Sequence, residues 1–157
     1  MAFDYYDNNV SKEINRRRNN YEGVELEKEG QLWYTAHSLV DLDCHLAREG
    51  GSYHGDIQPN TVLLTNFTAS PDVKTIDSTM VHLTKSTYDR MLYNKNIKAA
   101  VPPELCEQLE KKKVKPVYDP SKAESWSLGM NLLCQSTNTQ LDDYYDWNVP
   151  RVRYDAV

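Results

Sequence analysis

The clearest hydrophobic pattern in the chain lies between residues 31 and 65. Apolar residues recur there at steps of three and four, the spacing of one face of an amphipathic helix. This face comprises Leu32, Trp33, Ala36, Leu39, Val40, Asp43 and Leu46. The helix is expected to end at Gly50-Gly51, because glycine adopts the left-handed conformation common at helix C-termini. After a polar loop, the β-branched and apolar residues 61–65 predict a short strand.

Further elements are predicted downstream of this strand. Residues 73–76 form a second strand, and the turn signal Ser70-Pro71-Asp72 makes the two strands a hairpin. A polar stretch follows, with a short helix around residues 88–93. Another helix begins at Pro102-Pro103-Glu104, because proline suits the first turn and glutamate complements its positive end. Residues 121–135 are apolar on nearly all sides, which predicts a central buried helix. The fold class expected is therefore mainly α with a small β-hairpin.

The first thirty residues differ in composition from the rest. Tyr, Asn and charged residues dominate, and too few aliphatic residues are present to offset the entropy of ordering the segment alone. We therefore divide the chain into a polar N-terminal extension (1–30), a folded region (31–147) and a C-terminal tail (148–157). Within the extension a short helix is expected from Ser11, which acts as its N-cap. Arg16-Arg17-Arg18 is interpreted as a solvated helix face or a contact to an acidic partner, with a phosphate-binding patch as the alternative.

Charge and composition exclude several classes of protein. The chain has 157 residues and a net charge of −5, from 18 Lys plus Arg and 23 Asp plus Glu, which disfavours an electrostatic nucleic-acid binder. It contains neither a membrane-length apolar run nor a signal peptide pattern. Three cysteines without a CxxC pair indicate reduced thiols, and hence a cytoplasmic protein. Lys111-Lys112-Lys113 is interpreted as favourable charge at a helix C-terminus, with a basic binding site as the alternative.

Four short motifs occur in a distinctive order. His54-Gly55-Asp56-Ile57-Gln58-Pro59 precedes the first strand, and Ile76-Asp77-Ser78-Thr79 follows the second. Pro102-Pro103-Glu104 opens one helix, and residues 122–129, which include Glu124-Ser125-Trp126-Ser127, open the central helix. Together they resemble the C-lobe of eukaryotic protein kinases over residues 31–147, with its catalytic loop, Asp-Phe-Gly, Ala-Pro-Glu and Asp-x-Trp-Ser-x-Gly motifs. The resemblance implies a partial kinase C-lobe.

The resemblance also implies roles for two acidic residues. Asp56 stands at the position of the catalytic base, and Asp77 at that of the magnesium-binding aspartate. However, Gln58 replaces the lysine that neutralises phosphoryl charge, Thr61 replaces the asparagine that binds the second metal, and Ser78-Thr79 replaces Phe-Gly. We therefore expect an inactive pseudokinase in which Asp56 and Asp77 are vestigial. No ATP, cofactor or metal binding is expected.

Other positions are expected to be structural, again from the resemblance. Glu124 stands where the family has an acid that accepts hydrogen bonds from the catalytic-loop backbone. Glu104 stands where the family has a glutamate paired with an arginine, so a cation is expected beside it, from Arg151, Arg153 or another chain. The residues interpreted as structural are His54, Glu104, Glu124 and Trp126.

The region upstream of the motifs lacks kinase features. No glycine-rich loop or Val-Ala-x-Lys strand occurs, only thirty residues precede the long helix, and only ten follow Trp147. We therefore expect neither the ATP-binding lobe nor the final C-lobe helices, which leaves apolar surface uncovered for a partner. The interface candidates are Trp126, Met130, Leu133, Tyr144, Tyr145 and Trp147.

Three functional hypotheses follow. The first is a non-catalytic kinase-like structural or scaffold subunit, bound to other protein subunits of a larger intracellular assembly, for which a cytoskeletal or ciliary array is one natural setting. The second is a regulatory pseudokinase that binds a true kinase or phosphatase. The third is a protein kinase completed by another chain. Neither nucleic acid nor membrane is an expected partner.

Overall fold

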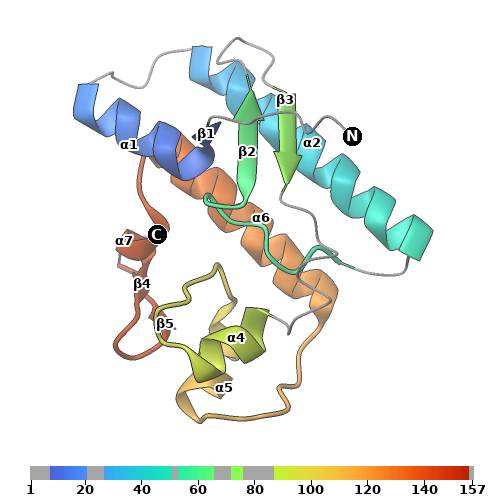
Figure 1. Ribbon diagram of the computed structural model, residues 1–157, viewed down its shortest axis with the longest axis vertical. Helices are drawn as coiled ribbons and strands as arrows, with labels where there is room; N and C mark the ends of the chain where they lie inside the picture. The colour runs from blue at the N-terminus through green and yellow to red at the C-terminus, as the bar shows by residue number, and fades with distance from the viewer. Residues whose placement is uncertain (1–7, 21–26, 51–52, 66–71, 76–86, 156–157) are drawn as a thin grey trace, which may run out of the picture.

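The chain folds into helices with two small antiparallel sheets (Figure 1). The structure is a computed structural model that describes residues 8–20, 27–50, 53–65, 72–75 and 87–155. The helices in this part are α1 (Val10–Asn20), α2 (Glu27–Gly50), α4 (Thr87–Tyr93), α5 (Pro103–Glu110), α6 (Pro120–Thr137) and α7 (Leu141–Tyr144). The strands are β1 (Asn8–Asn9), β2 (Val62–Thr65), β3 (Asp72–Thr75), β4 (Tyr145–Asp146) and β5 (Arg151–Val152). The predicted class, mainly α with a small hairpin, is confirmed.

The predicted hairpin is present as β2 and β3. Val62 pairs with Thr75 and Thr65 with Asp72 in an antiparallel register. The sequence pattern gave no sign of a third strand, but β1 pairs with β2 through Asn8 and Leu64. Because β1 has only two residues, both asparagine, it lacks the apolar alternation that predicts a strand.

Helix α1 lies inside the predicted N-terminal extension and packs against the folded region. Val10 and Ile14 are almost completely buried. The predicted cap at Ser11 is wrong: Asn9 Oδ1 accepts the Lys12 N–H at 2.9 Å, and the Ser11 hydroxyl instead donates to Gln140 Oε1 at 2.8 Å. A capping side chain has to come from the residue just before the helix, and the helix starts at Val10.

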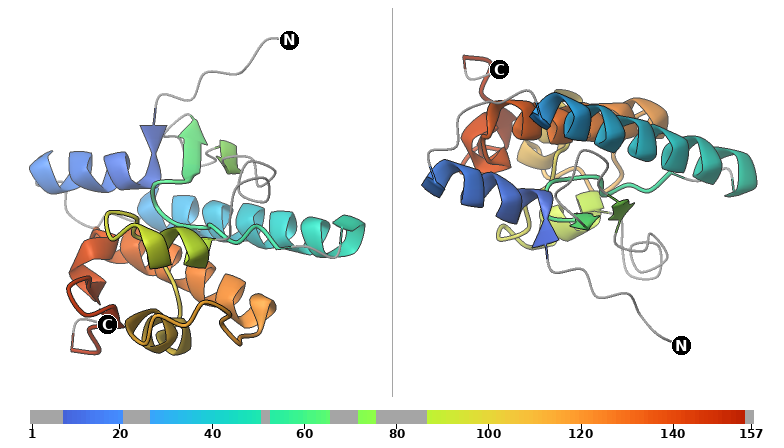
Figure 2. Two further views of the ribbon diagram at one scale, coloured as in Figure 1. Left: turned by 60° about the horizontal axis from the view of Figure 1, so that its bottom comes forward. Right: turned by 90° about the horizontal axis from the view of Figure 1, so that it is seen from above.

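Helices α2 and α6 pack against each other and form the framework of the molecule, with the three-stranded sheet and α1 on one side of α6 and α4, α5 and the C-terminal segment on the other (Figures 1 and 2). Helix α2 ends at Gly50 as predicted. Leu39 and Thr35 are buried along its inner face, whereas Trp33 and Val40, which were assigned to the same face, are exposed. Residues at steps of three and four can form two stripes, and the pattern alone could not separate them.

Helix α6 is less completely buried than its composition suggested. Glu124, Met130, Asn131 and Cys134 are buried, but the opposite side of the helix, including Ser125 and Gly129, faces solvent. Asp119 caps the helix, since its carboxylate accepts the N–H groups of Ser121 and Lys122.

The C-terminal segment folds back onto α6. Strands β4 and β5 pair through Tyr145 and Val152. Tyr145 is completely buried; its hydroxyl accepts the Trp126 Nε1–H and donates to the Val101 carbonyl oxygen, both at 2.8 Å. One hydroxyl therefore joins β4, α6 and the segment that leads into α5.

Apolar residues of the described helices contribute to the interior of the protein and form no membrane-spanning segment. Among the helices formed by the described residues, none has an apolar stretch long enough to cross a bilayer. Buried hydrophobic residues instead form one interior cluster shared by all the major elements, which includes Ile14, Leu39, Ile57, Val62, Leu105, Met130 and Tyr145.

We predict that Tyr145→Phe lowers the free energy of unfolding by about 1–3 kcal/mol, because the Trp126 N–H and the Val101 carbonyl both lose their partner. Urea denaturation monitored by tryptophan fluorescence measures the change. Tyr154→Phe is the matched control, because this tyrosine is exposed and its substitution should alter stability by no more than about 0.5 kcal/mol. Equal unfolding curves for the two variants would contradict the role of the Tyr145 hydroxyl.

Candidate functional site

The loop between α2 and β2 buries several polar residues that form hydrogen bonds within the loop and to α6. His54, Asp56, Ile57 and Gln58 are all buried in it, although three of them are polar. Burying polar groups costs free energy unless each finds a partner. The loop is therefore a costly structure that the rest of the molecule has to support.

Glu124 provides the main support from α6. One carboxylate oxygen accepts the His54 N–H and the other accepts the Gly55 N–H, both at 2.9 Å. These are the hydrogen bonds that the kinase resemblance led us to expect at this position. Burial raises the pKa of Glu124 to about 7, even though the two backbone N–H groups stabilise the charged form.

Gly55 takes a backbone conformation that glycine adopts readily. Its φ is +75°, in the left-handed region, and a Cβ atom built at this position would meet no atom within 4 Å. The requirement for glycine is therefore conformational and not steric. Its carbonyl oxygen accepts the Thr87 hydroxyl at 2.9 Å, which joins the loop to the start of α4.

Thr61 closes the loop at its other end. The Thr61 hydroxyl lies within hydrogen-bond distance of the Asp56 carbonyl oxygen. The hydroxyl oxygen of Thr61 also accepts the backbone N–H of Gln58 at 3.1 Å. The Gln58 carbonyl in turn accepts the Thr61 and Val62 N–H groups, at 2.9 and 3.1 Å. The side chain of Thr61 is thus engaged within the loop.

Asp56 lies at the centre of the loop. Its Oδ1 accepts the Gln58 Nε2–H at 2.9 Å, and its backbone N–H lies 3.3 Å from His54 Nδ1. Burial raises the pKa of Asp56 to about 6, and this effect outweighs the opposing influence of the Arg90 charge and the Gln58 hydrogen bond. A fraction of Asp56 is therefore protonated just below neutral pH.

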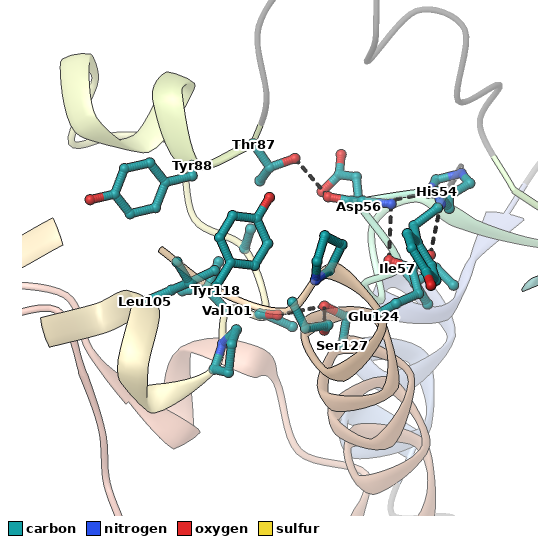
Figure 3. A pocket seen from close by; sticks show the side chains of 17 residues that line it. His54, Asp56, Ile57, Thr87, Tyr88, Val101, Leu105, Tyr118, Glu124 and Ser127 are labelled. Atoms are coloured by element: carbon teal, nitrogen blue, oxygen red, sulfur yellow. Dashed lines mark hydrogen bonds between the residues drawn. The ribbon is translucent and has the colours of Figure 1, made fainter. Parts of the chain in front are cut away.

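A cavity of about 400 Å³ opens beside the loop (Figure 3). Figure 3 shows Tyr88 and Leu105 on one side of it and His54 and Ile57 on the other. The lining is mainly apolar, and its polar members include Asp56, Glu124 and Ser127. The Ser127 hydroxyl already donates to the Ala100 carbonyl at 2.7 Å.

A second, more polar cavity of about 510 Å³ lies at the other side of Asp56. Gln58, Arg90, Lys98 and Gln140 contribute to its walls. Lys98 is already paired with Asp142 at 2.7 Å. Neither Arg90 nor Lys98 stood out in the sequence, because nothing in their spacing links them to the loop at residues 53–60.

The candidate site residues from the sequence are only partly brought together. His54, Asp56 and Glu124 meet at the loop, whereas Asp77 lies outside the described residues. Glu104 is exposed, and within the described part of the chain no ion pair joins it to Arg151 or Arg153; Arg151 lies 3.7 Å from Asp146 instead. The expected cation at Glu104 is therefore not supplied by the described tail residues.

The interface candidates do not form an exposed surface. Met130, Tyr144 and Tyr145 are buried within the chain, and Trp126, Leu133 and Trp147 are half-buried. The Trp147 ring stacks on Tyr145, with ring centroids 4.7 Å apart. The expectation of an open apolar face failed here because the segment after α6 folds back over it.

Among the described residues, no group of three or more His, Cys, Asp or Glu side chains has the arrangement needed to hold a metal ion. Comparison of the sequence with models of known protein families and with curated proteins finds no match. Function therefore has to be argued from the site itself.

We predict that Glu124→Gln lowers the free energy of unfolding by about 1–3 kcal/mol, because the amide carries one acceptor oxygen where two N–H groups need one each. Chemical denaturation of both proteins measures this difference. Glu110→Gln, at an exposed position on α5, is the control and should be close to neutral. Indistinguishable stabilities for the two variants would show that the loop does not depend on Glu124.

A second prediction concerns pH. Because the pKa of Asp56 is raised from 3.8 to about 6, the folded protein keeps a proton that the unfolded chain loses between these values. Stability from this source is complete below about pH 4 and falls as the pH rises to about 6. Asp56→Asn cannot titrate and removes this dependence. Glu124 remains in both proteins, and its contribution differs between them only through the Asp56 charge, which is the smallest of the causes that shift the pKa of Glu124.

The measurement is the difference in unfolding free energy between the wild-type protein and Asp56→Asn at several pH values from 4 to 7. A shift of about two pKa units predicts that the wild-type protein loses roughly 3 kcal/mol relative to the variant across this range. Parallel pH profiles would contradict a raised pKa at Asp56.

Proposed function

We propose that this chain is a kinase-like protein without catalytic activity, which serves as a structural subunit of a larger cytoplasmic assembly. The order of its elements supports a kinase-like ancestry: a long helix, a loop containing His54 and Asp56, a hairpin, a short helix after Pro102 and a central helix that holds the loop through Glu124. The motif resemblance concerns residue types, and the observed order of elements adds the backbone arrangement on which those motifs lie.

The use of Gln58 and Thr61 carries the non-catalytic part of the proposal. In a kinase the residue at Gln58 would neutralise the transferring phosphoryl group, and the residue at Thr61 would bind a metal ion. Here the Gln58 amide donates to Asp56 and the Thr61 hydroxyl is bonded within the loop. Neither side chain carries a positive charge, and both are used to hold the loop closed.

Gly55 supports the same conclusion. A kinase has an arginine at this position that pairs with a phosphate on the activation segment. The positive φ of Gly55 would place an arginine in a strained conformation. The backbone conformation of the loop therefore favours glycine at this position. We do not propose that a phosphate on the activation segment regulates the protein through residue 55.

The subunit role is supported by exposed apolar residues on α2. Trp33 is 75% exposed and Val40 46% exposed on the outer side of this helix. Exposed apolar groups that lie together mark interaction surfaces more often than isolated ones do. A protein that retains a costly loop as a structural support and presents such a surface suits a binding role better than a catalytic one.

The proposal is tested by nucleotide binding and by native mass. We expect no saturable binding of magnesium-ATP by the full chain in titration calorimetry, no phosphate transfer to a generic protein substrate, and no effect of Asp77→Ala or Asp56→Asn on either measurement. Saturable binding that Asp77→Ala abolishes would overturn the non-catalytic assignment and favour a kinase completed by another chain.

The second part of the experiment is purification from the native source under non-denaturing conditions. We expect the chain to elute in a complex well above its own 18.2 kDa, with non-enzymatic proteins in fixed stoichiometry. Elution as a free chain would overturn the subunit role. A true kinase or phosphatase as the stoichiometric partner would replace the structural role with a regulatory one.

A further inference from the structure

The apolar cavity beside the loop at residues 53–60 has no part in the proposed subunit role. Its volume of about 400 Å³ lies within the range of small-molecule sites, which is roughly 300–1,000 Å³. The wall is built from the loop, the start of α4, the segment 99–102 that leads into α5, and the first turns of α6. Small-molecule sites of this kind have a mainly apolar lining in which a few polar groups hold one end of the ligand. The charge of those polar groups therefore decides which ligand fits.

The lining is acidic. Among the described residues that form it there is no lysine or arginine, whereas Asp56 and Glu124 both contribute and are only 9% and 2% exposed. His54 also lines the cavity, but its Nδ1 lies 3.3 Å from the Asp56 nitrogen and can accept that N–H only while Nδ1 is unprotonated. A buried carboxylate is costly without a positive charge close to it. The cavity therefore disfavours an anionic ligand and favours a cationic one.

Asp56 has a carboxylate oxygen left for such a ligand. Its Oδ1 accepts the Gln58 amide, but within the described part of the chain its Oδ2 has no hydrogen-bond partner. Arg90 influences Asp56 by its charge and lines the polar cavity on the other side of this residue. Both oxygens of Glu124 already accept backbone N–H groups, so Glu124 contributes negative charge rather than a free acceptor. Burial raises the pKa of both carboxyl groups, as expected for acids without a full counter-charge.

Three tyrosines improve the fit for a cation. Tyr53, Tyr88 and Tyr118 belong to the wall, and Figure 3 shows Tyr118 between Tyr88 and Glu124. Burial raises the pKa of Tyr118, and the charges of Asp89 and Glu124 raise it further, so this phenol is close enough to respond to the Glu124 charge. Aromatic rings attract organic cations, and cages that combine them recognise ammonium groups in other proteins.

We propose that this cavity binds a small organic cation, an amine or quaternary ammonium that carries an apolar group, with its charged nitrogen beside Asp56. The apolar group then contacts the wall, to which Ile57, Val101 and Leu105 contribute. A metal ion fits less well, because a mainly apolar wall supplies too few oxygen ligands. This inference goes beyond the proposed function and does not rest on it, since a structural subunit need not bind a small molecule.

Titration calorimetry of the full chain with three matched probes tests the proposal. The probes 3-phenylpropylammonium, 3-phenylpropan-1-ol and 3-phenylpropanoate share one apolar part and differ in charge. We expect saturable binding of one ammonium per chain, binding of the alcohol that is weaker by at least about tenfold, and no saturable binding of the carboxylate. Equal affinities for the ammonium and the alcohol would overturn the proposal. So would tighter binding of the carboxylate, or no saturable binding of any of the three probes.

Two substitutions locate the site. Asp56→Asn removes the charge and keeps the shape, so the ammonium should bind at least about tenfold more weakly while the affinity for the alcohol changes by less than about twofold. Ala123→Leu fills part of the cavity from the wall on α6 with a residue that favours helix, and should abolish the binding of both probes. Glu104→Gln is the matched control, because it removes a negative charge from an exposed position outside the lining and should leave both affinities unchanged.

Circular dichroism verifies that each variant is folded. Unchanged ammonium binding by folded Asp56→Asn would overturn the placement of the cation. If Asp56→Asn does not fold, Ala123→Leu decides the location, and wild-type affinity in that variant would place the ligand elsewhere and overturn the proposal. A chain that binds the ammonium but purifies alone from its native source would support this inference and remove the subunit role, so the two proposals fail separately.

Discussion

Glu124 accepts the N–H groups of His54 and Gly55, and the rest of the structure around the candidate site depends on this contact. Through it a helix that starts at residue 120 supports a loop that ends near residue 60. The loop in turn fixes the start of β2 through the Gln58 carbonyl and the start of α4 through Thr87. Without the carboxylate, the buried His54 N–H and the part-buried Gly55 N–H would lack a partner, and an unpaired buried N–H group is costly.

The same constraint explains the character of the site. Because the loop carries Asp56 into the interior, desolvation raises the pKa of its carboxyl group, and the neighbouring polar side chains are needed to satisfy the loop itself. The side chains of Gln58 and Thr61 both form hydrogen bonds within the loop. The Gln58 amide donates to the Asp56 carboxylate, and the Thr61 hydroxyl contacts the backbone of Asp56 and Gln58, so both side chains support the loop.

Much of the fold could be predicted from residue patterns, for reasons that are local. The end of α2 at a glycine, the hairpin around its turn residues and the start of α5 at a proline each depend on the conformational preferences of a few adjacent residues. The hydrogen bonds of Glu124 could be anticipated only through the kinase resemblance, because no local rule connects residues seventy positions apart.

The failed predictions concern long-range packing. The exposure of Trp33 and Val40 could not be inferred because α2 carries two apolar stripes, and only the partner elements decide which stripe is buried. The burial of Met130, Tyr144 and Tyr145 depends on strands of two residues each, which are too short to leave a pattern. Arg90 and Lys98 approach the site only because α4 and the segment after it fold back beneath the loop.

The contacts of Gln140 have a consequence for how the chain reaches its native state. This residue bonds to the Ser11 hydroxyl, the Ser11 carbonyl and the Asn15 side chain, and Arg18 lies 3.2 Å from Asp143 nearby. These pairs join segments about 125 residues apart, so they close a loop that spans most of the polypeptide. Since such closures are entropically costly and slow, α1 is expected to dock onto the segment around Gln140 late in folding, after the elements between them have formed.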